Sequence, residues 1–240
     1  MLPILVLCGG LGTRLRSVVA DRPKVLAPVG DRPFLGHLLD HLQREGLDDV
    51  VLATGYLGEQ VEAYAAEHSL DGVRVRCVQE REPLGTAGAL AFAAREAGIA
   101  GPFLALNGDT FFGGSLRKLV QAHEPAYAAT LALVRVDDAA RYGRVIADEA
   151  SGRVERFEEK GGAPGAAWIN AGAYVLGPDV LEGVQKGSLE REIFPVLVEQ
   201  RRLGACPFYD ALFLDIGTPA DFVRAPDALR RLGTPPGGAA

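Results

Sequence analysis

The stretch LPILVLCGGLGTRLR, residues Leu2–Arg16, decides the fold class. Its first six residues form an apolar run of strand length, and glycines follow at positions 9, 10 and 12. A buried strand that runs into a glycine-rich turn is typical of a parallel α/β sheet, in which ligands bind outside the carboxyl ends of the strands. We therefore expect Leu2–Leu7 to be a buried strand and the segment after it to line a binding site.

Strand and helix patterns alternate through the first half of the chain. The further predicted strands are Val50–Ala53, Val73–Val78 and Phe103–Leu106, and the predicted helices are Pro33–Glu45, Leu57–Glu67, Thr86–Ala97 and Ser115–His123. Alternation at these lengths predicts right-handed βαβ units and a mostly parallel sheet. The fold class is therefore α/β.

The pattern changes after Ala126, where predicted strands follow one another without helices between them. These strands are Ala128–Val136, Arg144–Ala147, Arg153–Phe157 and Trp168–Leu176, and they precede a helical stretch Leu189–Leu203 and a closing helix Pro219–Leu232. We interpret this half as a sheet extension and lid on the same core. The chain is then one catalytic domain, residues 1–232, with a flexible tail at 233–240.

The composition is that of a globular protein, with 48% hydrophobic and 23% charged residues among 240. Lys and Arg number 25 against 31 Asp and Glu, and this net charge of −6 argues against a duplex nucleic-acid partner. No run approaches the roughly 18 apolar residues of a membrane span, and no basic residue precedes Arg14 as in a signal peptide. The cysteines Cys8, Cys77 and Cys206 form no CxxC motif and favour a reducing compartment. We expect a cytoplasmic protein without a nucleic-acid or membrane partner; its oligomeric state stays open, with a homodimer as one candidate.

The segment after the first strand combines glycine with positive charge. Gly9, Gly10 and Gly12 let a phosphate approach the backbone closely. Five basic and only two acidic residues follow between positions 11 and 35, which favours a phosphate-binding loop over a turn with solvated arginines. No lysine follows a glycine, which excludes a P-loop, and Leu15 stands where the GxGxxG fingerprint of a nicotinamide dehydrogenase requires its third glycine.

Ordered motifs along the chain resemble those of the sugar-1-phosphate nucleotidyltransferase family. They are GGLGTRL (Gly9–Leu15) with RPK (Arg22–Lys24), EPLGTAGA (Glu82–Ala89), LNGDT (Leu106–Thr110), Glu159-Lys160 with INAGAY (Ile169–Tyr174), and LDIGTP (Leu214–Pro219). The resemblance covers nearly the whole chain. It implies a Rossmann-like, three-layer α/β/α fold of the nucleotide-diphospho-sugar transferase type, with a mixed, mostly parallel sheet. It also implies an enzyme that joins a nucleoside triphosphate to a sugar 1-phosphate and releases pyrophosphate.

Four segments are most similar to family members that transfer GMP to D-glycero-α-D-manno-heptose 1-phosphate. They are RLRSVVADRPK (Arg14–Lys24), GYLGEQV (Gly55–Val61), NGDTFF (Asn107–Phe112) and RYGRV (Arg141–Val145). The resemblance therefore favours GTP and this heptose 1-phosphate, with mannose 1-phosphate as the next choice, followed by glucose 1-phosphate with dTTP. Cys8 and Val25 depart from the alanine and proline usual in the family. A non-catalytic nucleotide-sugar sensor is the alternative class, but such a protein would lose the charged site residues.

The resemblance implies a role for each site residue. The catalytic residues are Arg14, Lys24 and Asp109; the nucleotide contacts are Gly9, Gly10, Gly12, Thr13, Arg14, Gln79, Gly85 and Thr86; the sugar-phosphate contacts are Gly143, Glu159, Lys160 and Asn170; and Asp109 and Asp215 hold Mg²⁺. Mg²⁺ takes few protein oxygens together with substrate phosphates, which suits two carboxylates. Their separation in sequence leaves a helix N-cap role for Asp109 and a turn role for Asp215 as alternatives.

The proposed nucleophile needs no general base. A phosphate monoester has its second pKa near 6 and is therefore mostly a dianion at pH 7. Catalysis by positioning and charge neutralisation then suffices, which agrees with the lack of a Ser/His/Asp or Cys/His pattern. We expect His37 and His41 to be a pair on a helix surface and not a metal site, and Trp168 to contact the sugar or pack in the core.

Overall fold

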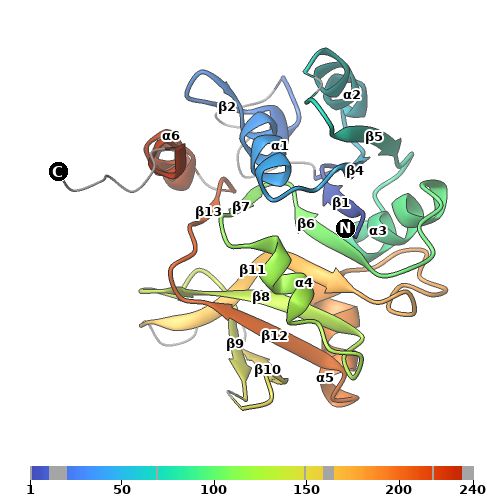
Figure 1. Cartoon of the computed structure of the whole chain (residues 1–240), viewed down its shortest axis with the longest axis vertical. Coiled ribbons are helices and arrows are strands. Elements are labelled where there is room, and N and C mark those ends of the chain that lie inside the picture. The colour runs from blue at the N-terminus through green and yellow to red at the C-terminus, as the bar shows by residue number, and fades with distance from the viewer. Residues whose placement is uncertain are drawn as a thin grey trace.

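The computed structural model describes residues 2–10, 21–68, 70–148, 150–158, 165–217 and 219–233. Over these residues the main sheet has nine strands and is mixed, with helices on both faces (Figure 1). Its spatial order is β10 (Val154–Glu158), β9 (Arg144–Ala147), β11 (Ala167–Leu176), β6 (Phe103–Asn107), β1 (Ile4–Leu7), β4 (Asp49–Thr54) and β5 (Arg74–Gln79), while β8 (Ala129–Val136) pairs with β11 and β12 (Leu203–Phe208) pairs with β8. The predicted fold class is confirmed.

Strand β1 lies inside the parallel part of the sheet, between β4 and β6. Ile4 is opposite Val50 on one side and Leu104 on the other, and β4 continues in parallel to β5. The side chains of Ile4, Leu5 and Val6 are fully buried. An unbroken apolar run is what a parallel strand covered on both faces requires.

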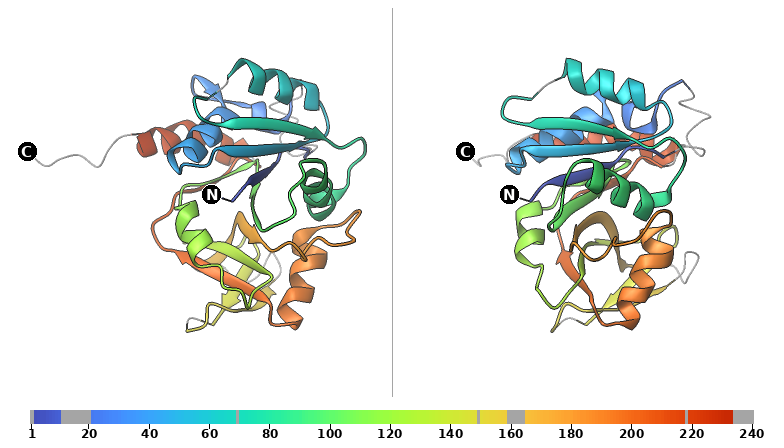
Figure 2. Two further views of the ribbon diagram at one scale, coloured as in Figure 1. Left: turned by 45° about the vertical axis from the view of Figure 1, so that its right-hand side comes forward. Right: turned by 90° about the vertical axis from the view of Figure 1, so that its right-hand side faces the viewer.

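The helices divide between the two faces according to the alternation of the strands. The helices are α1 (Phe34–Arg44), α2 (Gly58–Glu67), α3 (Gly85–Glu96), α4 (Leu116–Gln121), α5 (Phe194–Glu199) and α6 (Pro219–Gly233). Ile4 and Val6 share a core with α1, α2 and α4, whereas Leu5 shares one with α3 and α5. The left view of Figure 2 shows α4 and α5 on opposite sides of the strands between them.

The second half extends the same sheet, and one predicted helix ends four residues earlier than expected. The stretch Leu189–Leu203 begins as a π-helical turn, Leu189–Ile193, continues as α5 and ends at Glu199. Arg201 then adopts a left-handed conformation (φ 57°), and Leu203–Phe208 forms β12, parallel to β8. A short apolar run can form either a helix or a strand. Residues 203–208 form a strand because they pair with the edge of β8.

Two small pairs of short strands were not predicted. Strand β2 (Pro28–Val29) pairs with β3 (Arg32–Pro33), and β7 (Thr110–Phe112) pairs antiparallel with β13 (Phe213–Asp215). A third core beneath the second pair joins Phe111, Leu214 and the α6 residues Ala225 and Leu229. This packing ties the closing helix to the turn after β6.

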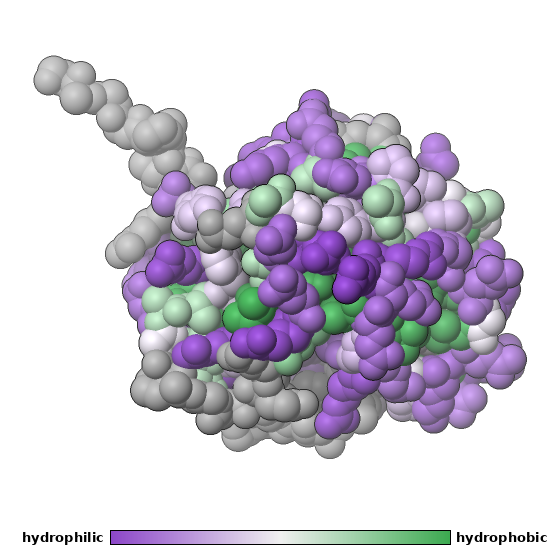
Figure 3. All heavy atoms as spheres, turned by 90° about the horizontal axis from the view of Figure 1, so that it is seen from below, coloured by the Kyte–Doolittle hydropathy of each residue, from purple (hydrophilic) through white to green (hydrophobic). Residues whose placement is uncertain are grey.

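The surface seen from below is mostly polar, with charged and polar side chains around a strip of apolar ones (Figure 3). Among the described residues, no helix has both the length and the apolar character needed to cross a bilayer. Residues 234–240 of the predicted tail lie outside the described part of the chain.

Candidate active site

The carboxyl ends of the parallel strands meet at one edge of the sheet. Gly9 follows β1, Gly55 follows β4 and Glu80 follows β5. A Cβ atom on Gly9 would lie 3.0 Å from Oε1 of Glu80, and one on Gly55 would lie 2.9 Å from the same oxygen. Glycine at both positions therefore leaves room for the Glu80 carboxylate between the first two loops. Burial raises the pKa of Glu80, whose Oε2 accepts a hydrogen bond from the Leu84 N–H at 3.2 Å.

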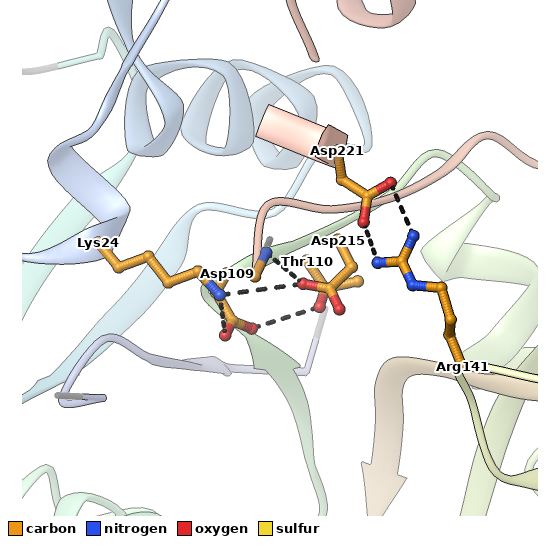
Figure 4. A network of polar contacts seen from close by, with 7 residues as sticks. Lys24, Asp109, Thr110, Arg141, Asp215 and Asp221 are labelled. Carbon is orange, nitrogen blue, oxygen red and sulfur yellow. Dashed lines mark hydrogen bonds and ion pairs between the residues drawn. The ribbon is translucent and has the colours of Figure 1, made fainter. Parts of the chain in front are cut away.

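The pairing of β7 with β13 brings the two predicted metal ligands together. Asp109 lies in the turn between β6 and β7, and Asp215 ends β13. Asp215 is opposite Thr110 in the pair, and the Ile216 N–H donates to the Asp109 carbonyl oxygen at 3.1 Å. Asp109 therefore caps no helix; it faces Asp215 across the site (Figure 4).

Lys24 supplies the positive charge between these carboxylates. Its Nζ donates to Oδ2 of Asp109 at 2.7 Å and lies 3.9 Å from Oδ1 of Asp215. The Lys24 side chain is 11% exposed, against 44% for Asp109. Buried Val25 and Leu26 complete the 3₁₀ turn Lys24–Leu26 and anchor the lysine. The only predicted cation of the site that lies in the described part of the chain is thus in contact with the acidic pair.

The surroundings of Asp215 disfavour its charged form. Burial, followed by the nearby Asp109 carboxylate, raises the pKa of Asp215, while Lys24 and the Gly217 N–H lower it. The described residues contain no group of three or more His, Cys, Asp or Glu side chains that could hold a metal. Two carboxylates nevertheless fit Mg²⁺, because that ion completes its coordination with water and substrate phosphates.

Two predicted nucleotide contacts, Gly85 and Thr86, lie after β5 and hold the start of α3 against the segment 187–190. Gly85 has φ 75°, and a Cβ there would meet the Gly187 carbonyl oxygen at 2.3 Å. The Thr86 hydroxyl donates to Oε2 of Glu190 at 3.1 Å and accepts from the Leu189 N–H at 2.8 Å. The Thr86 side chain therefore anchors the π-helical turn, and its hydroxyl is engaged within the protein.

The other predicted contacts of this loop differ in exposure. Gln79 is exposed at the end of β5, and its Nε2 donates to the Gly55 carbonyl oxygen at 3.2 Å. Gly10 is exposed, and no atom lies within 4 Å of the position of a Cβ there. Both residues lie at the carboxyl edge where the nucleotide was predicted to bind.

A buried polar network continues from this loop towards the predicted sugar side. Fully buried Tyr174 accepts hydrogen bonds at its hydroxyl from Nδ2 of Asn170 at 3.0 Å and of Asn107 at 3.4 Å, and it donates to Oε1 of Glu190 at 3.5 Å. Oδ1 of Asn170 accepts from the Gly172 N–H. Sequence reasoning did not assign Tyr174 or Glu190 a role; the Tyr174 signal was its place in the INAGAY motif.

Several predicted site residues lie outside the described part of the chain. They are Gly12, Thr13 and Arg14 of the first loop and the pair Glu159 and Lys160. Their roles stay predictions. Gly143 is half-buried in the loop between β8 and β9, directly before Arg144, which pairs with Ile169 next to Asn170.

The remaining predictions concern histidine and tryptophan. His41 is 8% exposed and packs 5.2 Å from the Phe111 ring, so the expected surface position is wrong for this residue, because α1 turns it towards the third core. Nε2 of His37 instead lies 2.9 Å from the Val29 carbonyl oxygen. Trp168 is half-buried and packs edge-on against Tyr209, with 5.0 Å between ring centroids.

Comparison with known proteins gives relatives that are named as nucleotidyl or guanylyl transferases. The model of the family described as "Nucleotidyl transferase" matches residues 4–231. A probable mannose-1-phosphate guanylyltransferase 2 of Arabidopsis thaliana is 38% identical over 91% of this chain and 62% of its own length. The mannose-1-phosphate guanylyltransferase of Mycobacterium tuberculosis is 38% identical over 96% of this chain and 66% of its own length. The chain thus spans about two thirds of these relatives or slightly less.

A solved structure matches over nearly its full length. HddC from Yersinia pseudotuberculosis, crystallised with GMP-PN, superposes with a TM-score of 0.83 at 30% identity, over 95% of this chain and 99% of HddC. Together with the family match and the acidic pair at the carboxyl edge, this likeness leads to one conclusion. The chain belongs to the nucleotidyl transferase family.

Proposed function

We propose that this protein transfers GMP from GTP to the phosphate of a manno-configured sugar 1-phosphate, releasing pyrophosphate, with Mg²⁺ as its metal ion. The observation that carries the proposal is the cluster of Lys24, Asp109 and Asp215 at the carboxyl edge of the sheet. Such a cluster offers both a cation for phosphate oxygens and carboxylates for a metal ion. That combination suits phosphoryl chemistry, in which positioning and charge neutralisation dominate.

The choice of GTP has two supports. The relatives of 38% identity are named mannose-1-phosphate guanylyltransferases, and HddC was crystallised with GMP-PN. Guanine also presents an N–H and an exocyclic amine that need acceptors. The half-buried carboxylate of Glu80, beside Gly9 and Gly55, is an acceptor at the right edge of the sheet.

Two sugars are proposed, each from a different observation. Similarity in the GYLGEQV, NGDTFF and RYGRV segments favours D-glycero-α-D-manno-heptose 1-phosphate. The names of the relatives favour mannose 1-phosphate, the second candidate. The heptose carries one additional CHOH unit, and a site that hydrogen-bonds this hydroxyl would discriminate strongly, whereas additional space alone would discriminate weakly.

The described residues divide the chemistry between them. The sugar phosphate is already a dianion, so an oxygen of it attacks the α-phosphorus of GTP without a base, and the bond to pyrophosphate breaks. Lys24 neutralises charge that grows at the α-phosphate, while Asp109 and Asp215 hold Mg²⁺. The metal ion, when bound, supplies positive charge to the triphosphate oxygens. Gly9 and Gly10 present backbone to the nucleotide, and Asn170 and Gly143 lie towards the sugar.

A pyrophosphate-release panel tests the proposal. It crosses GTP, ATP, UTP and dTTP with the heptose, mannose and glucose 1-phosphates, with and without Mg²⁺. We expect the highest kcat/KM with GTP and a manno-configured sugar. A higher value with UTP or dTTP would refute the nucleotide assignment, and a preference for glucose 1-phosphate would refute the sugar assignment. Activity that survives chelation of all divalent ions would refute the metal.

A further inference from the structure

A buried carboxylate at the start of α6 links this helix to the loop between β8 and β9. The side chain of Asp221 is 3% exposed, and both Arg141 and Arg224 bind it. Arg141 comes from the loop between β8 and β9 and makes a two-point contact: its Nη1 donates to Oδ1 and its Nη2 to Oδ2 (Figure 4). Two-point arginine contacts fix orientation as well as charge.

The two arginines do different structural work. Arg224 lies three residues further along the same helix, and its side chain is 72% exposed. Arg224 therefore supplies positive charge to the carboxylate from within its own helix. The contact with Arg141 instead joins residues 80 positions apart and crosses from a loop to a helix.

A second contact holds the same loop against the strand that carries Asp215. The ring of Tyr142 packs edge-on against Phe213 of β13, with 5.5 Å between centroids. Burial, and then the carboxylates of Asp221 and Asp215, raise the pKa of the Tyr142 hydroxyl. The loop therefore contacts the chain both before Asp215, at Phe213, and after it, at Asp221. Gly143 directly follows Tyr142 in this loop.

We propose that Arg141 and Asp221 are a positioning pair, which holds the loop 137–143 against the Asp215 segment and so sets the place of Gly143 relative to the acidic pair. Its effect on sugar-phosphate binding rests on the proposed function. Its effect on the loop itself does not, because that effect follows from the contacts alone. Neither residue is among the predicted metal ligands or nucleotide contacts.

The test compares Arg141→Ala and Asp221→Asn with Arg224→Ala, the matched control that removes the other arginine of the same carboxylate. Amide hydrogen exchange over residues 139–144 of the free enzyme is the first measurement. Exchange should accelerate at least about tenfold in the first two variants and stay within about twofold of wild type in the control, because local opening follows lost contacts. Equal exchange in all three variants would overturn the proposal.

Steady-state kinetics with the best substrate pair of the panel is the second measurement. The KM for the sugar 1-phosphate should rise about tenfold in Arg141→Ala and Asp221→Asn, below the roughly hundredfold cost of a 1 Å misplacement, while the KM for the nucleotide changes little. Arg141→Lys should recover part of the loss, and the double variant should be no worse than Arg141→Ala. An equal rise for both substrates, or an unchanged KM for the sugar, would overturn the proposal.

Two further outcomes distinguish failure of the positioning role from failure of the proposed function and from direct substrate binding by Arg141. If wild type turned over no pair in the panel, the proposed function would fail, and hydrogen exchange would still decide whether the pair holds the loop. If Arg141 bound substrate directly, Arg141→Ala would raise the KM while Asp221→Asn left it unchanged, and the positioning role would be refuted.

Discussion

Replacing Lys24 with alanine removes the cation that both site carboxylates share. Its Nζ lies 2.7 Å from Oδ2 of Asp109 and 3.9 Å from Oδ1 of Asp215. At about 4 Å, an ion pair is worth about 1 kcal/mol in water and about 4 kcal/mol at the effective dielectric of a protein surface. Asp109 is nearly half exposed, so the lower part of this range applies to its contact. We therefore expect a modest loss of folding stability and a large loss of turnover.

Turnover should fall further than stability because the charge that Lys24 meets grows in the transition state. Removing one preorganised charge of this kind costs about a hundredfold to a thousandfold in kcat. The KM for GTP should change less than kcat. Initial rates of pyrophosphate release at saturating substrates measure this, with Lys118→Ala as the control. Nζ of Lys118 lies over the Phe208 ring, 4.7 Å from its centroid and away from the acidic pair.

Metal binding by the free enzyme gives an independent test of whether Lys24 competes with Mg²⁺ for the two carboxylates. Lys24 occupies the carboxylates that are proposed to hold Mg²⁺, so Lys24→Ala should bind Mg²⁺ more tightly without substrate. Added Mg²⁺ should then raise its melting temperature more than that of wild type. A variant with near-normal kcat, or one that Mg²⁺ stabilises no more than wild type, would refute the reasoning.

Three further variants test other parts of the site. Asp109→Asn keeps the shape of the side chain but loses its charge, so kcat should fall at least about a hundredfold with little change in melting temperature; near-normal turnover would sink the metal assignment. Asp215→Asn should raise the free energy of unfolding of the metal-free protein at pH 7 by about 1 kcal/mol, as removal of a strained active-site charge often does. The raised pKa of Asp215 means that the folded state favours its protonated form, so the advantage of the variant should shrink as pH falls through the raised folded-state pKa and should be gone below the unfolded-state pKa of about 4. Urea titrations that show the same advantage over wild type at pH 7 and at pH 3.5 would contradict this. Thr86→Val removes the acceptor of the Leu189 N–H, while the Glu190 carboxylate keeps the Ser188 hydroxyl, and it should lower the free energy of unfolding by about 1 to 3 kcal/mol; an unchanged urea midpoint would contradict the network.

Most elements of the first half could be predicted because their signals are local. The apolar run Leu2–Leu7 contains β1, and the periodicity of Pro33–Glu45 contains α1. The boundaries differ by one or two residues, as expected where caps and fraying decide the ends. Strand β12 (Leu203–Phe208) was not predicted, because it becomes a strand only by pairing with β8, more than 60 positions earlier in the chain.

The candidate site shows the same division. Motif resemblance selected Lys24, Asp109 and Asp215 one by one, and strand-end geometry placed Asp109 at the carboxyl edge of the sheet. It selected neither Glu190 nor Asp221, whose partners Thr86 and Arg141 lie 104 and 80 positions away. A glutamate or aspartate on a helical segment has no local feature that distinguishes a solvated side chain from one that contacts another element.

The sequence by itself determined the strand–helix alternation, the glycine-rich loop after β1 and the residue types of the site, because each depends on neighbours within a few positions. Only the tertiary structure decided that Asp215 faces Asp109, since their meeting depends on the pairing of β7 with β13, two three-residue strands more than 100 positions apart. Such short strands carry almost no periodicity of their own, and the burial of Phe111 and Leu214 beneath α6 holds them together. The contact between Lys24 and both carboxylates follows from that packing.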